Sequence, residues 1–161
     1  MDYLIHLFII FSIWLIVVMG LNVLAGHLGI VSLAQASFFA VGAYGYAIAT
    51  TAFDWGFLPA IAIAIGSGTL LSLAVSLASW RLRRDFLVLA TLSLQMTVYH
   101  VIRLWAVPTE PLGSWRNLTN GTSGIPHIPR PPLLGGATDD TAFMQLVAVI
   151  TACCLGLVYV L

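Results

Sequence analysis

Polar side chains recur at four-residue steps in the apolar segment between residues 86 and 105. They are Thr91, Gln95, Tyr99 and Arg103. A helix places residues four apart on the same face, so these side chains form one polar line. A glutamine near the centre of a bilayer is unfavourable in lipid, so this face should point inward. Two hypotheses stay open: hydrogen bonds between helices, worth about 0.6 kcal/mol each, or the lining of a path for a solute.

The stretch from Gly20 to Thr51 is apolar enough to enter a bilayer, yet it carries polar side chains at Asn22, His27, Ser32, Gln35 and Ser37. Asn22 and Gln35 would need partners in hydrocarbon, because polar groups are costly there. We therefore group them with Thr91, Gln95 and Tyr99 as candidates for a translocation path. No fixed charge lies at the middle of a predicted span, and that fits a neutral or zwitterionic solute.

Motifs for other chemistry are absent from the sequence. There is no G-x-x-x-x-G-K-[ST] loop, no H-E-x-x-H motif and no pair of catalytic carboxylates within the apolar segments. Cys153 and Cys154 are adjacent, so on a helix they point to different faces and predict neither a disulfide nor a metal site. We expect no catalytic residue, no metal and no cofactor in this chain, which is therefore not an ATP-binding subunit.

The composition is that of a membrane protein. The chain has 161 residues, of which 60% are hydrophobic and 7% are charged, whereas soluble domains carry about 25% charged residues. The formal net charge is zero, with six basic residues, all arginine, against six acids. A basic surface for nucleic acid is therefore absent.

Five apolar segments approach the ~20 residues that cross a bilayer. They predict an all-α, polytopic membrane helix bundle in one partial transmembrane domain, with spanning helices at about 3–25, 29–52, 57–79, 86–106 and 142–161. The acidic residue Asp2 and the length of the first segment argue against a signal peptide. Gly26 and Gly29 are expected to interrupt the helix. The fifth segment reaches Leu161 with no polar residue after it, from which we expect a truncated chain.

Small residues recur along the second predicted helix, as expected of a helix that packs closely against another. The predicted packing residues are Ser32, Ala36, Ala40, Gly42 and Ala43. The same pattern suits burial against a pore-forming bundle or ordinary close packing. Replacement of Gly42 by leucine should disrupt this contact, because a bulky side chain would enter it.

Clustered arginines set the predicted topology. Arg81, Arg83 and Arg84 follow the third apolar segment, and positive charge beside a span indicates the cytoplasmic side. The amino terminus and the proline-rich loop 107–141 then lie outside. Arg103, Arg116 and Arg130 fall on that outer side and weaken the charge asymmetry.

Several segments together resemble a known family. They are GLNVLAG at 20–26, SLAQASFFAVGAY at 32–44, the RLR turn with the Thr-containing helix at 81–104, and WRNLTNGTSGIPHIPRP at 115–131. This combination resembles the LivM-type inner-membrane permeases of branched-chain amino acid ABC transporters, a family that also includes urea permeases.

The resemblance implies the amino-terminal half of a permease subunit in a binding-protein-dependent ABC importer of the bacterial inner membrane. Its partners would be a second permease subunit, two cytoplasmic ATPase subunits that use the ATP, and a periplasmic or extracellular substrate-binding protein. The solute would be a branched-chain amino acid or a related small neutral or zwitterionic molecule. The loop residues Trp115, Thr119, Gly121 and Gly124 match the family's external loop, which faces the binding protein.

Alternatives stay open at this point. Gln35 stands where many relatives have histidine, so the resemblance does not distinguish leucine from urea or a short amide. An ATP-independent transporter or channel is a different class, as is a small membrane scaffold. Such transporters tend to place an ionisable residue or an ion site at the midplane. In place of such an ionisable residue, this sequence offers only the neutral Asn22 and Gln35.

Overall fold

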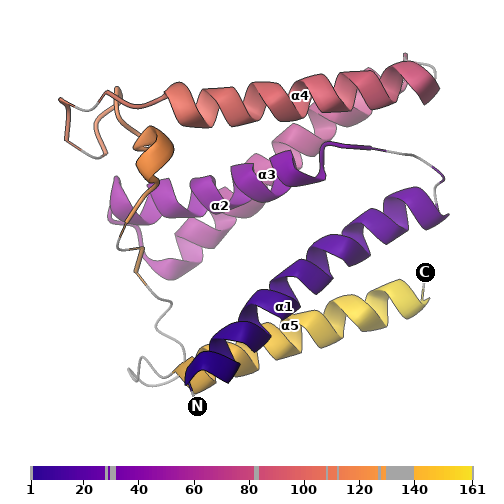
Figure 1. Ribbon diagram of the computed structural model, residues 1–161, viewed down its shortest axis with the longest axis horizontal. Helices are drawn as coiled ribbons and strands as arrows, with labels where there is room; N and C mark the ends of the chain where they lie inside the picture. Colours follow the sequence, from indigo (N-terminus) through magenta and orange to yellow (C-terminus); the bar gives the residue numbers. More distant parts are fainter. Residues whose placement is uncertain are drawn as a thin grey trace. The chain divides into compact units, whose positions relative to one another are not determined.

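The computed structural model describes residues 2–27, 29, 32–81, 84–107, 109–111, 113–126, 128–129 and 140–160. All regular structure in this part of the chain is helical, which confirms the predicted all-α membrane fold (Figure 1). The chain divides into two compact units. The first combines Met1–Ile30 with Arg130–Leu161, and the second is Val31–Pro129.

Four helical segments are long and apolar enough to cross a membrane: Tyr3–His27, Phe57–Leu77, Phe86–Leu104 and Phe143–Val160. Large apolar side chains on all of them are exposed at the surface of their units. Such surfaces are stable against lipid or against other apolar helices, and they identify a multi-pass membrane protein.

The first unit pairs α1 (Asp2–Asn22) with α5 (Asp140–Val160). The amino terminus lies beside the start of α5 in Figure 1, so these two helices run in the same direction. α1 continues into a π-helical turn, η1 (Val23–His27), and Gly29 follows with φ +61°. The α-helix is therefore interrupted at the predicted place, because glycine permits the positive φ at little cost.

The second unit contains α2 (Gln35–Thr51), α3 (Phe57–Ser79), α4 (Arg84–Leu104) and the short 3-10 turn η2 (Gly121–Ser123). α2 and α3 form a hairpin and pack together along their length. Small residues at this contact, Gly42 and Gly45 on α2 and Ala64 on α3, allow the close approach.

The predicted start of the second helix near Gly29 is wrong. α2 begins at Gln35, and Ser32, Leu33 and Ala34 are not helical. The physical reason is a tertiary contact. The backbone N–H of Leu33 donates to Thr91 Oγ1 at 3.1 Å, and the Ala34 N–H donates to Ser32 Oγ at 3.3 Å. These bonds satisfy backbone groups that a helix would otherwise use.

Among the described glycines of α2, Gly45 makes the tightest contact with α3. A Cβ atom there would lie 2.9 Å from Ser67 Oγ and 3.6 Å from Ala64 Cα. At Gly42, the predicted packing residue, a Cβ would lie 3.9 Å from the Ala64 carbonyl oxygen, an ordinary contact distance. Gly42 therefore contacts α3, but Gly45 is the tighter position.

The arginine-rich turn joins α3 to α4. Arg81 is exposed in this turn. Arg83 lies outside the described residues, and the structure describes only the backbone of Arg84, where α4 begins. The predicted cytoplasmic placement of these arginines stays a prediction.

Candidate functional site

A cavity of about 560 Å³ lies between α2, α4 and η2. Its size falls within the roughly 300–1,000 Å³ typical of small-molecule sites. The residues that line it come from these three elements: Ala36, Ser37, Ala40 and Tyr44 on α2, Gln95, Met96, Val98, Tyr99, Ile102 and Arg103 on α4, and Gly121 and Thr122 on η2.

Helical periodicity explains why these side chains converge. Ser37, Ala40 and Tyr44 are spaced three and four residues apart on α2, so they share a face. Gln95 and Arg103 share a face of α4 in the same way. Because α2 and α4 run in the same direction and Leu33 is bonded to Thr91, Ser37 lies level with Gln95. Arg103 is eight residues further, roughly 12 Å along the axis.

The end of the cavity formed by Ser37 and Gln95, which we call the inner end, holds an unpartnered hydroxyl. Ser37 is 2% exposed, and among the described residues its Oγ has no hydrogen-bond partner. A buried hydroxyl without a partner costs about 1–3 kcal/mol. Ser37 is therefore an unsatisfied polar group in the wall of the cavity.

The opposite end, formed by Arg103, Gly121 and Thr122 and called the outer end, holds a cation. The Arg103 guanidinium donates a hydrogen bond to the Tyr99 hydroxyl and lies over the Tyr99 ring, 5.3 Å from its centroid. These two contacts hold the side chain in one orientation along α4. Within the described residues no carboxylate forms an ion pair with Arg103.

The loop after α4 builds the outer rim of the cavity. Thr119 is 4% exposed, and its hydroxyl lies 2.6 Å from the Ile102 carbonyl oxygen and 2.9 Å from that of Trp105. It thereby satisfies carbonyls that the end of a helix leaves open. Gly121 has φ +56°, and a Cβ there would lie 2.8 Å from the Arg103 carbonyl oxygen. η2 therefore sits directly on the last turn of α4.

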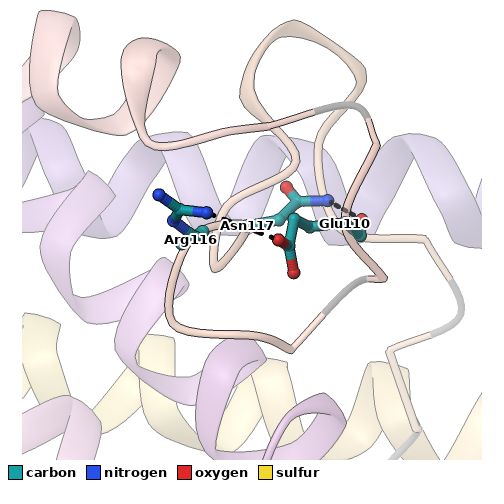
Figure 2. Close-up of polar contacts among 3 residues, drawn as sticks. All are labelled: Glu110, Arg116 and Asn117. Carbon is teal, nitrogen blue, oxygen red and sulfur yellow. Dashed lines mark hydrogen bonds and ion pairs between the residues drawn. The ribbon is translucent and has the colours of Figure 1, made fainter.

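A second set of contacts shapes the loop at residues 110–117. Figure 2 shows Asn117 donating its side-chain N–H to the Glu110 carbonyl oxygen at 2.9 Å. The carboxylate of Glu110 lies 3.7 Å from the Arg116 guanidinium. That ion pair is exposed, so it adds little stability. The buried amide of Asn117 is the stronger constraint on the loop.

The structure brings two of the five path candidates into the cavity, Gln95 and Tyr99. Thr91 is 2% exposed, and its hydroxyl donates to the Val88 carbonyl at 3.0 Å while accepting from Leu33. It joins α2 to α4 and does not line the cavity. Gln35 is half-buried and is not among the lining residues, and Asn22 is exposed in the first unit.

The predicted packing residues do not all have the same role in the structure. Ala36 and Ala40 line the cavity, where their small size leaves room opposite Gln95 and Tyr99. Ser32 is buried and fixes the turn before α2, whereas Ala43 is exposed. Spacing alone does not distinguish a helix face that packs from one that borders a cavity.

Among the loop candidates, Trp115 is 77% exposed and is held by its backbone, whose carbonyl accepts from Trp105 Nε1 at 2.8 Å. Gly124 faces open space. Thr119 and Gly121 instead face α4. A partner that approaches the loop would meet Trp115 and not these two residues.

Seven lining residues were not predicted as site residues: Ser37, Tyr44, Met96, Val98, Ile102, Arg103 and Thr122. A signal for the first two exists in the sequence, because Ser37 and Tyr44 are seven residues apart and share a helix face with Ala40. Thr122 reaches the cavity only through the fold of the loop. Among the described residues no group of three metal-ligating side chains occurs.

Comparison with known proteins identifies similar sequences. A family model described as "Branched-chain amino acid transport system / permease component" matches residues 3–161. The high-affinity branched-chain amino acid transport system permease protein LivM of Escherichia coli (strain K12) is 31% identical over 134 residues, 81% of this chain and 28% of the relative. The protein of the same name from Salmonella typhimurium (strain LT2) is 31% identical over 127 residues, 76% of this chain and 27% of the relative. No solved structure matches this one.

Proposed function

The chain belongs to the permease component family of branched-chain amino acid transport systems, and on that premise we propose that it is a membrane-spanning subunit of an ABC importer for a branched-chain amino acid or a related small neutral or zwitterionic solute. The family match over residues 3–161 carries this proposal. The family is a transport component and not an enzyme. The alignments cover 28% and 27% of the two relatives, so the activity of the whole permease is part of the proposal.

The cavity supports a transport role on physical grounds. Its walls are mainly apolar, with Met96, Val98 and Ile102 among them, and polar groups stand at the two ends. Apolar walls suit an aliphatic side chain, and a few polar groups fix the orientation of a bound molecule. We propose that the solute passes along α2 and α4 between the level of Arg103 and the level of Gln95.

The proposed partners supply what this chain lacks. A P-loop is absent from the sequence, so ATP would be bound by separate cytoplasmic subunits, paired with a second permease subunit. A binding protein would deliver the solute at the side where Trp115 is exposed. With the arginine turn cytoplasmic, that side is the outer face of a bacterial inner membrane.

A urea or amide permease is the second candidate. Ser37 and Gln95 carry neutral hydrogen-bonding groups, and these suit an amide as well as an amino acid. Arg103 favours the amino acid, because a guanidinium pairs best with a carboxylate.

ATP dependence tests the importer class directly. The permease carrying this chain, reconstituted in liposomes, is expected to show no leucine flux until the ATPase subunits, ATP and the binding protein are all present. Radiolabelled L-leucine uptake and ion conductance measure this. Flux or conductance from the permease alone would refute the importer and favour a channel. ATP-driven uptake of urea with no uptake of leucine would favour the second candidate.

Gln95→Leu is expected to lower uptake several-fold without lowering the amount of protein in the membrane. The change keeps the side-chain size but removes a polar group from the cavity wall, and loss of one hydrogen bond to a solute is worth about 0.5–1.5 kcal/mol. Uptake per molecule and membrane abundance are measured together. Gln95→Asn, which keeps a neutral amide, serves as the polar control. Reduced abundance with normal uptake per molecule would assign Gln95 to helix packing.

A further inference from the structure

We propose that Arg103 binds the carboxylate of the solute at the outer end of the cavity between α2 and α4. This inference rests on the proposed function, and it assigns a residue and a substrate chemistry to the same site. It predicts that the permease itself, and not only its binding protein, recognises the carboxylate of an amino acid.

The position and the partners of Arg103 carry the inference. Its side chain lines the cavity, and Tyr99, one turn earlier on α4, holds the guanidinium through a hydrogen bond and a ring contact. The hydrogen bond occupies one guanidinium nitrogen, Nη1. A guanidinium has five N–H donors in a fixed fork, so most of them stay available to a carboxylate, which it binds through two parallel hydrogen bonds.

The absence of an internal partner strengthens the argument. Within the described part of the chain, the one ion pair joins Arg116 to Glu110, both on the loop. Arg103 is exposed at the rim of this mainly apolar cavity, and its attraction for an anion on the cavity side is screened less than it would be in bulk water. A zwitterionic solute brings such an anion without a net charge.

A second, independent observation marks the cavity as a ligand site. Ser37 is 2% exposed, lines the cavity and has no hydrogen-bond partner among the described residues. A buried polar group is normally satisfied. A solute held by Arg103 at the outer end advances towards Ser37 and Gln95, whose neutral groups can bond it without trapping it by charge.

Arg103 also has a purely structural explanation. It lies in the last turn of α4, where a cation is favourable beside the negative end of the helix dipole and where long basic side chains reach the membrane interface. A lysine would serve both of these structural purposes. It would not provide the planar, two-pronged contact with a carboxylate. The two explanations therefore differ in what Arg103→Lys and a solute without a carboxylate would do.

The test measures binding of L-leucine and of L-leucinamide to the assembled permease complex in nanodiscs, without the binding protein. The wild type is expected to prefer leucine, and Arg103→Gln should weaken leucine binding roughly 10- to 100-fold, the range of a lost charge-assisted hydrogen bond, with leucinamide unchanged. Arg103→Lys should restore only part of the preference. Arg81→Gln, an exposed arginine at the opposite end of α4, is the matched control and should bind as the wild type does.

Several outcomes overturn the inference. They are a wild type that binds both solutes alike or binds neither, an Arg103→Gln variant with unchanged leucine affinity, and a variant that loses only its docking with the binding protein. ATP-driven leucine uptake by the wild type is measured in parallel. If the wild type takes up leucine and any of these outcomes is found, only the role of Arg103 is rejected and the proposed function stands. If the wild type takes up no leucine, the proposed function itself is rejected.

Discussion

Gly45→Leu is expected to separate α2 from α3 and to lower the stability of the second unit. A Cβ at Gly45 already lies 2.9 Å from Ser67 Oγ and 3.6 Å from Ala64 Cα, so three further carbon atoms have no room unless the helices move apart. Forced overpacking costs about 1–3 kcal/mol. The apparent melting temperature in detergent and the amount of folded protein in the membrane both measure the effect.

Matched leucine substitutions isolate the packing effect. At Gly68 on α3 nothing lies within 4 Å of the added Cβ, so Gly68→Leu should leave the melting temperature almost unchanged. Gly42→Leu is expected to act in the same direction as Gly45→Leu but less strongly, because the nearest atom to its Cβ is 3.9 Å away. Equal effects at Gly45 and Gly68 would show that α2 and α3 do not pack as described.

Gly121→Ala is expected to detach η2 from the end of α4 and to open the outer rim of the cavity. The residue has φ +56°, and an added Cβ would lie 2.8 Å from the Arg103 carbonyl oxygen and 2.9 Å from Ala106 Cβ. A strained backbone position costs about 1–3 kcal/mol, and here the neighbouring backbone atom cannot rotate away. Faster chymotrypsin cleavage beside the exposed Trp115, together with weaker leucine uptake, measures the change.

A helical glycine supplies the control for this substitution. Gly66→Ala on α3 meets no atom within 4 Å, and alanine in a helix is about 0.5–1 kcal/mol more favourable than glycine. It should be neutral or slightly stabilising and leave loop cleavage unchanged. If Gly121→Ala also leaves cleavage and uptake unchanged, the loop does not depend on its contact with α4.

The sequence alone predicts the class of the protein and the identity of its helices. Apolar segments long enough for a bilayer and the scarcity of charge decide that the chain is a helical membrane protein, because both depend only on local composition. The four-residue steps of Gln95, Tyr99 and Arg103 likewise place them on one face of a helix, since helical periodicity is a property of the chain itself.

Tertiary structure decides which neighbour each helix face meets. Thr91 belongs to the same polar line, yet it bonds to the backbone of Leu33, whereas Gln95, one turn later, borders the cavity. Thr119 and Gly121 match an external loop but face α4 because the loop folds back on that helix. Periodicity fixes the direction of a side chain relative to its own helix, and only the packing of α2, α4 and η2 places Ser37 and Arg103 at the two ends of one cavity.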